Sequence, residues 1–179
     1  GLKMLSHPKT ARNGNIIASI GMLIAIVTTV YLGTELDFQK IIIAMIIGSV
    51  IGAFFAIKVE MTQMPQLVAI FNGFGGGASA LVASSEFLKA HQNARLDDIN
   101  FLGISIALSI LVGTLTLTGS FIAFGKLQGL VSSKPITFPG QQIFNGLLAV
   151  LLLCAAYLIF SEYAINSLYA ILLLSALLG

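Results

Sequence analysis

PQLVAIFNGFGGGASALVAS, residues 65–84, is a run of twenty residues without a single charged side chain. A helix of about 20 predominantly apolar residues is long enough to cross the hydrocarbon core of a bilayer. Pro65 stands at the beginning of the run, and proline is tolerated in the first turn of a helix. The stretch therefore predicts a transmembrane helix.

Five further apolar segments accompany this one. The predicted spans cover residues 16–33, 41–57, 65–84, 100–125, 142–160 and 163–179. Of the 179 residues, 57% are hydrophobic and only 9% are charged, and the mean hydropathy is +0.99. A soluble domain carries about 25% charged residues. The composition predicts an all-α membrane protein, a polytopic bundle of about six transmembrane helices, with one transmembrane domain over residues 1–179 and no soluble domain.

The loops predict how the chain is oriented. Segments 1–15, 58–64 and 126–141 would share one side of the membrane. They hold Lys3, Lys9, Arg12, Lys58, Lys126 and Lys134. The loops on the other side contain only three Lys or Arg residues, namely Lys40, Lys89 and Arg95. Because Lys and Arg concentrate in cytoplasmic loops, the amino end is predicted to be cytoplasmic. The net charge of +2 is too small to indicate nucleic acid binding.

The span at 65–84 contains an asparagine followed by a glycine cluster. Asn72 lies about 10 Å into the predicted helix at 1.5 Å per residue, where an unpaired carboxamide is costly. The cluster consists of Gly73, Gly75, Gly76 and Gly77. Each glycine weakens a helix by up to about 1 kcal/mol relative to alanine. Close packing, a hinge, or water reaching the backbone would offset that cost, and all three readings remain open.

Polar and small residues form a stripe on each of two predicted spans. On the third span, Asn72, Gly76, Ser79 and Ala83 share one helical face. On the fourth, the stripe is Ser105, Ser109, Gly113, Thr116 and Ser120. Two interpretations stay open: packed helices whose hydroxyls bond their own backbone, or the wall of a hydrated transport path. The second span adds a close-packing motif, Gly48-x-x-x-Gly52.

No Asp, Glu, Lys, Arg or His lies in the core of a predicted span, and His7 and His91 fall in loops. No catalytic residue and no metal site is predicted. Gly73, Gly75 and Ala78 fit the G-x-G-x-x-A fingerprint of dinucleotide binding. That fingerprint requires a preceding strand and an acidic residue about 20 positions later. Neither is present, so we expect this chain to bind no nucleotide.

Three motifs give the chain a family resemblance. VEMTQMPQLVAIFNGFGGGASALVA at 59–83 closely resembles the β subunit of proton-translocating NAD(P) transhydrogenase. LSHPKTARNGN at 5–15 and TLTGSFIAFGKLQGLVSSKPITFPGQ at 116–141 resemble it too, in the same order along the chain. The resemblance covers most of the sequence.

The resemblance implies a membrane domain that couples proton flow to hydride transfer between NAD(H) and NADP(H) on soluble partner domains. It implies a fragment of that domain, without the NADP(H)-binding domain, in a bacterial inner membrane. The implied partners are one or more α-type subunits, the NADP(H)-binding domain and the lipid bilayer, with the whole complex a homodimer.

The resemblance also implies roles for single residues. Ser120 matches a serine of the family's proton path, and Asn72 falls where some members have an intramembrane histidine. Asn cannot titrate as imidazole does, so the titratable group would come from another helix or subunit. Ser79, Thr116 and Ser109 complete the expected path. The expected cytoplasmic coupling loops are marked by Lys58, Glu60, Lys126 and Lys134. An equal alternative is that the positive charges there only set the topology of the chain.

Two other functions compete with this one. Polar stripes on transmembrane helices also fit a small-solute secondary transporter. A structural membrane anchor would have the same composition, but its polar stripes would be dry and filled by helix packing.

Overall fold

The computed structural model describes residues 2–33, 37–92, 101–132, 134, 137–161 and 163–179. The described chain is helical, which confirms the predicted fold class. The chain divides into two compact units, residues 1–57 and residues 58–179, and each is described by itself. Within the described residues, five helices are long and apolar enough to cross a membrane.

The first unit consists of the short helix α1 (Leu2–Leu5) followed by α2 (Pro8–Leu32) and α3 (Phe38–Lys58). Pro8 occupies the beginning of α2, where its missing N–H costs no helical hydrogen bond. At the other end, the N–H of Gly33 closes the last turn on the carbonyl of Thr29. Apolar side chains cover both long helices and are exposed within the unit, as expected for surfaces that face lipid.

Asp37 caps the amino end of α3. Its carboxylate accepts a hydrogen bond from the backbone N–H of Lys40, over 3.3 Å, and lies 2.9 Å from the Lys40 ammonium. The side-chain hydrogen bond from Lys40 is the main reason that the pKa of Asp37 is lowered from its ordinary value. The stabilisation from this carboxylate is therefore present above its unfolded-state pKa and is lost as the pH falls through its folded-state pKa.

We expect Lys40→Ala to raise the pKa of Asp37 back towards its ordinary value. The backbone N–H of residue 40 remains as a donor, so the return should be incomplete. NMR titration of the Asp37 carboxyl carbon, before and after the substitution, measures the change. An unchanged titration midpoint would show that the Lys40 side chain does not stabilise the carboxylate.

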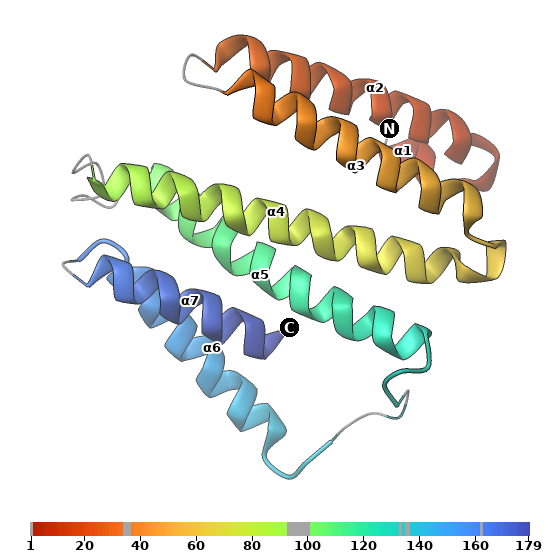
Figure 1. Cartoon of the computed structure of the whole chain (residues 1–179). Helices are drawn as coiled ribbons and strands as arrows, with labels where there is room; N and C mark the ends of the chain where they lie inside the picture. The colour runs from red at the N-terminus through yellow and green to blue at the C-terminus, as the bar shows by residue number, and fades with distance from the viewer. Residues whose placement is uncertain (1, 34–36, 93–100, 133, 135–136, 162) are drawn as a thin grey trace. The chain divides into compact units, whose positions relative to one another are not determined.

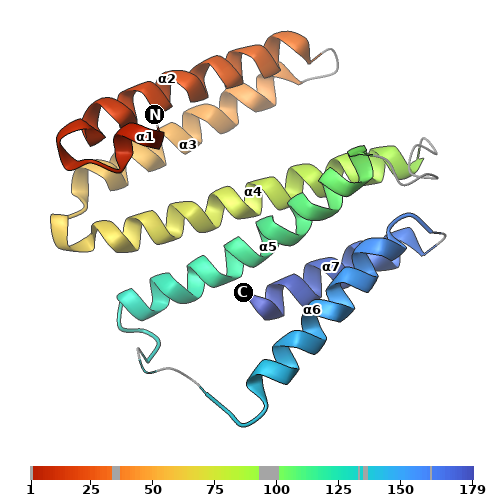
Figure 2. The same cartoon turned by 180° about the vertical axis from the view of Figure 1, so that it is seen from behind.

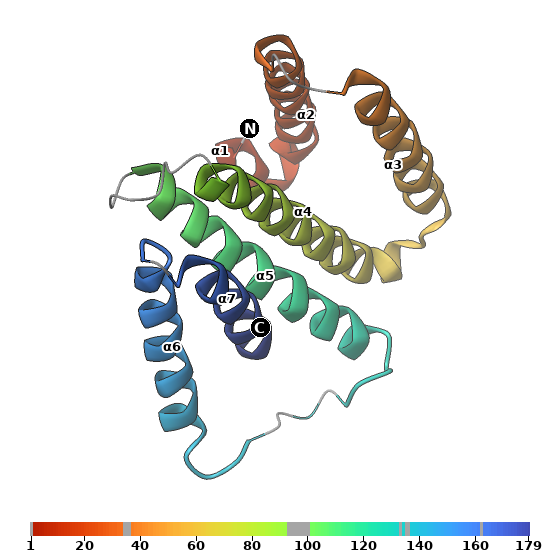
Figure 3. The same ribbon diagram turned by 60° about the vertical axis from the view of Figure 1, so that its left-hand side comes forward.

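The second unit begins with a 3-10 turn, η1 (Met61–Gln63), and continues into α4 (Met64–Gln92), α5 (Phe101–Leu127), α6 (Gln141–Leu158) and α7 (Ala164–Leu178). In this unit α4 and α5 lie side by side along most of their length (Figures 1 and 2). Helix α7 packs against both α5 and α6 and lies between them (Figure 3). The core where these helices meet includes the fully buried side chains of Phe87, Ile110, Ile159 and Ile171.

Two of these helices differ in length from the predicted spans. Helix α4 extends eight residues past the predicted end at 84. Glu86 and Lys89 pair over 3.0 Å on its final turns, and Lys89 and His91 place positive charge near its carboxyl end, both of which favour helix. Helix α7 has only 15 residues, a rise of about 22 Å at 1.5 Å per residue, which is less than the hydrocarbon thickness of about 30 Å.

The end of α5 is fixed by a glycine. Gly129 has a positive φ of 75°, a conformation that glycine adopts without steric cost. The N–H of Gly129 bonds the carbonyl of Lys126, and the N–H of Leu130 bonds the carbonyl of Gly125. This is the hydrogen-bond pattern of a Schellman motif. It stops the helix at the start of the predicted cytoplasmic loop.

Candidate functional site

Small residues make the contact between α4 and α5. The buried positions of α4 are spaced three and four residues apart, so they form one stripe along the helix. They are Gly73, Gly76, Ala80, Ala83, Phe87 and Ala90. Helices approach closely in a membrane when such residues line their interface. The stripe therefore explains how α4 tolerates its glycines: the helix is unbroken through them and packs against α5 at three of the four.

Gly76 and Gly113 mark the closest approach of the two helices. A Cβ on Gly76 would lie 2.7 Å from the carbonyl oxygen of Gly113 and 2.7 Å from Cβ of Thr116. A Cβ on Gly113 would lie 2.6 Å from the carbonyl oxygen of Gly76 and 2.8 Å from the backbone nitrogen of Ala80. Because backbone atoms of the facing helix are among the nearest neighbours at both positions, neither glycine can be enlarged unless the helices move apart.

The close approach brings two predicted site residues together. The Asn72 carboxamide nitrogen donates a hydrogen bond of 2.9 Å to the hydroxyl oxygen of Ser120. Gly73 sits beside this bond, because a Cβ there would lie 3.2 Å from Cβ of Ser120. Ser120 is buried, whereas Asn72 is exposed within this chain. The carboxamide oxygen of Asn72 makes no hydrogen bond to any other residue that the structure describes.

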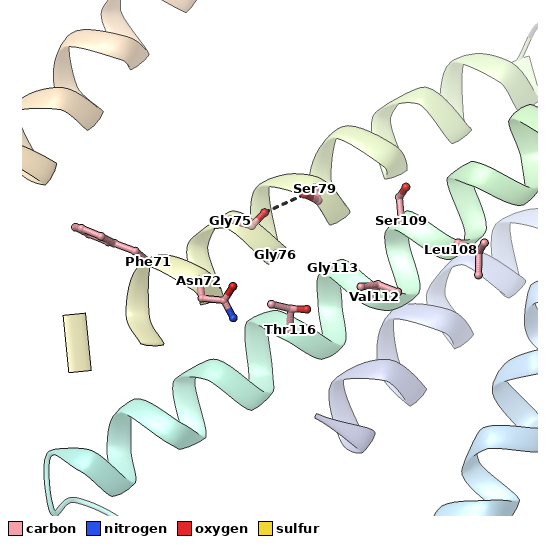
Figure 4. Close-up of a pocket in the computed structure, with 10 residues that line it drawn as sticks. All are labelled: Phe71, Asn72, Gly75, Gly76, Ser79, Leu108, Ser109, Val112, Gly113 and Thr116. Carbon is pink, nitrogen blue, oxygen red and sulfur yellow. Dashed lines mark hydrogen bonds between the residues drawn. The ribbon is translucent and has the colours of Figure 1, made fainter. Parts of the chain in front are cut away.

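An open groove of about 600 Å³ runs beside this hydrogen bond, between α4 and α5 (Figure 4). Its polar side chains are all among the residues that the sequence singled out: Asn72, Ser79, Ser109 and Thr116. Asn72 and Thr116 lie opposite each other from the two helices (Figure 4). None of the ten residues that line the groove is charged. The groove can therefore offer hydrogen bonds to water but cannot itself hold a proton as a titratable group.

The glycine cluster divides between packing and the groove. Gly73, Gly76 and Gly77 face α5, where a Cβ on Gly77 would lie 3.2 Å from the side chain of Leu117. Gly75 has nothing within 4 Å of the position of a Cβ, and it lines the groove. Its carbonyl accepts the hydroxyl of Ser79 over 3.0 Å, as the sequence reading of self-bonded hydroxyls anticipates.

The remaining predicted residues lie elsewhere. Within the described part of the first unit, a Cβ on Gly48 or Gly52 would meet nothing within 4 Å, so this pair makes no close contact inside that unit. Lys58 ends α3, and Glu60 precedes η1. Lys126 lies in the last turn of α5, and the backbone N–H of Lys134 donates to the Ser132 hydroxyl over 3.3 Å.

Two glutamines that the sequence reading did not single out join the same helices near the predicted cytoplasmic end. The Gln66 carboxamide donates to the carbonyl of Leu127 over 2.9 Å and accepts a hydrogen bond of 3.0 Å from Gln128. Gln66 precedes Asn72 by less than two helical turns. Its position on the same polar helix as Asn72 could have drawn attention to Gln66. Its hydrogen bond to Gln128 could not be predicted without knowing how the two helices pair.

Two buried hydroxyls of the second unit were also missed. Thr114 on α5 and Ser175 on α7 are buried, and their hydroxyls have no hydrogen-bond partner among the described residues. Thr118, one turn after Thr114, instead bonds the Thr114 carbonyl over 3.2 Å. The sequence pattern does not separate the two threonines, because their burial and hydrogen bonding depend on the helix packing.

Comparison with known proteins gives one consistent result. The model of the family described as NAD(P) transhydrogenase beta subunit matches residues 1–179, the whole chain. Two relatives named NAD(P) transhydrogenase subunit beta, one from Rhodospirillum rubrum and one from a defined strain of that species, are each 43% identical over 147 residues. The match covers 78% of this chain but only 31% of each relative. The chain thus spans about a third of the length of these relatives.

Proposed function

The chain belongs to the NAD(P) transhydrogenase beta subunit family, and we propose that it conducts protons through the membrane part of a transhydrogenase. Protons would cross along the groove between α4 and α5. Their movement would be coupled to hydride transfer between NAD(H) and NADP(H), which partner domains would bind.

The observation that carries this proposal is the Asn72–Ser120 hydrogen bond beside an open groove. A polar pair facing lipid would be costly, because hydrocarbon offers it no hydrogen bonds. We propose that water in the groove, or a polar residue of a covering helix, donates a hydrogen bond to the carboxamide oxygen of Asn72 and so satisfies it. The groove also favours this function over a structural anchor, whose polar stripes would be filled by packing.

The proton itself needs carriers that the groove does not contain. Asn, Ser and Thr side chains order water but do not titrate in the physiological range. We propose that water molecules carry the proton between the two helices and that a titratable group from another helix or subunit completes the path beside Asn72. An α-type subunit is the partner that the family implies for this role.

The predicted orientation explains how proton movement in the groove would be coupled to the NADP(H)-binding domain. The amino end and the loop after α5 would face the cytoplasm of a bacterial inner membrane, with Lys58, Glu60, Lys126 and Lys134 towards an NADP(H)-binding domain. The Gln66 contacts connect α4 to the last residues of α5. A change at Asn72 would therefore reach that loop through less than two turns of helix, and the coupling is an interaction free energy between two sites. The complete complex would be a homodimer.

Blocking the groove tests the proposed function. In the complete enzyme, reconstituted in liposomes with Cys154→Ala as background, we expect Ser79→Cys to react with a water-soluble thiol reagent. The reaction should abolish proton uptake coupled to hydride transfer, because the thiolate forms only where water reaches it and the adduct fills the groove. Dye-monitored proton uptake and mass spectrometry measure the two effects.

Leu81→Cys is the matched control for this experiment. Leu81 lies on the same helix, two residues on, and is exposed away from both the groove and α5. We expect a thiol there to face lipid and to stay unmodified, with proton uptake unchanged. If the Ser79 variant resists the reagent as the Leu81 variant does, or pumps normally after modification, the groove is not the proton path.

A further inference from the structure

A second open groove continues the first one along α4 and α5. It has a volume of about 490 Å³ and shares two lining residues, Ser79 and Ser109, with the groove beside Asn72. Ser105 adds a third hydroxyl, although it bonds the carbonyl of Phe101 over 2.7 Å. The two grooves therefore meet at one pair of serines, one on each helix.

A carboxylate lines the far part of this second groove. Asn72, Ser79 and Glu86 are spaced seven residues apart, so they lie on one face of α4. About 21 Å of helix rise separate Asn72 from Glu86 at 1.5 Å per residue. This distance is most of the hydrocarbon thickness of about 30 Å. The connected grooves thus extend from the Asn72–Ser120 bond to a titratable side chain near the carboxyl end of α4.

We infer that Glu86 is the residue through which the groove exchanges protons with the solution on the side of the membrane where α4 ends. This inference rests on the proposed function. Glu86 takes a proton from bulk water and passes it to a water molecule at Ser79 and Ser109, which returns Glu86 to its carboxylate form. The reverse order of the same two transfers releases a proton.

The surroundings of Glu86 fit an exchanging group. Its side chain is about half exposed (54%) and lies 3.0 Å from the Lys89 ammonium on the same helix. The facing turns of α5, residues 101–109, contain no charged side chain. The carboxylate lies at the mouth of the groove beside Lys89, and those turns of α5 add no cation to the site. Ser and Asn further along the groove cannot replace Glu86, because a hydroxyl or carboxamide does not take up a proton near neutral pH.

The test compares Glu86→Gln with Asp37→Asn in the complete enzyme in liposomes. Asp37 is also an exposed carboxylate that pairs with a lysine three residues later, but it lines neither groove between α4 and α5. We expect Glu86→Gln to slow coupled proton uptake about tenfold, which corresponds to about 1.4 kcal/mol of barrier. Glu86→Asp should retain most of the rate, and Asp37→Asn should leave it unchanged. NADP(H) binding should stay constant in all three.

Two results would overturn the inference. The first is that the Glu86→Gln enzyme pumps at the rate of the unmodified enzyme. The second is that Lys89→Gln slows pumping as much as Glu86→Gln does, because the ion pair and not the proton on Glu86 would then matter. Either result leaves the proposed function intact if the reagent still blocks the Ser79→Cys enzyme. If that block is absent, the proposed function fails independently of Glu86.

Discussion

Gly76→Ala and Gly113→Ala are each expected to lower the thermal midpoint of the protein in detergent, while Gly75→Ala is expected to maintain or raise it. At Gly76 and Gly113, the added methyl would lie within 2.8 Å of backbone atoms of the facing helix. Overpacking of this kind costs about 1–3 kcal/mol. The alanine returns up to about 1 kcal/mol through its better helix propensity, so a net loss remains.

Gly75 is a matched control because it belongs to the same helix and the same glycine cluster. A methyl group there meets nothing within 4 Å, so only the helix propensity changes, in favour of alanine. The sign of the effect should therefore reverse between two adjacent residues. Circular dichroism melts of the three variants measure it.

The double variant Gly76→Ala/Gly113→Ala tests the contact itself. Both methyl groups would force apart the same two backbones, so the second substitution should cost less than it does alone. Strict additivity, or equal melting of the Gly75 and Gly76 variants, would mean that α4 and α5 do not approach closely at this point.

The apolar segments predicted the helices well but not their ends. A span boundary drawn from hydropathy marks where polar residues begin, whereas a helix ends where its hydrogen bonds end. Helix α2 begins at Pro8, eight residues before the predicted span, because the polar residues that follow Pro8 continue the same backbone pattern. Helix α4 continues through Glu86 and Lys89 for the same reason.

The sequence predicted which residues of the candidate site share a helical face, but not which residues of the two helices touch. Heptad spacing placed Asn72 and Ser79 together, and a second stripe contained Ser120. The sequence could not tell which glycine of the cluster meets the neighbouring helix, because this depends on the path of α5. Gly75 and Gly76 differ by about 100° around the helix, and that rotation decides that one lines a groove and the other touches a backbone.

The packing and the polar pair depend on each other. Ser120 can accept a hydrogen bond from Asn72 only because glycine at 73, 76 and 113 lets the helices approach. A methyl group at Gly76 would push the helices apart near the bond. The packing and the hydrated-path interpretations of the two stripes are therefore compatible: the buried half of each stripe sets the spacing, and the exposed half borders the groove.

Asn72→Leu and Ser120→Ala are expected to impair proton-coupled turnover of the complete enzyme strongly while leaving NADP(H) binding in place. Leucine at 72 fills the space of asparagine but orders no water. Alanine at 120 removes the hydroxyl that accepts the hydrogen bond from Asn72. The nucleotide would be bound by a partner domain, outside this groove. Proton uptake into liposomes, measured together with NADP(H) affinity, separates the two effects.

Two control variants share the chemistry of these substitutions but not the location. Asn145→Leu replaces an exposed asparagine on α6. Ser167→Ala removes a buried α7 hydroxyl that bonds the carbonyl of Tyr163 over 3.0 Å. Neither residue lines a groove between α4 and α5, so both variants should pump normally if they fold.

A double variant distinguishes a shared role from two separate ones. If Asn72 and Ser120 act through their common hydrogen bond, Asn72→Leu/Ser120→Ala should pump no worse than the more impaired single variant. If each residue orders its own water molecule, the two losses should multiply. Unaltered proton pumping in both single variants would contradict the proposed path, because the groove would then conduct without the side-chain hydrogen bond that joins its two walls.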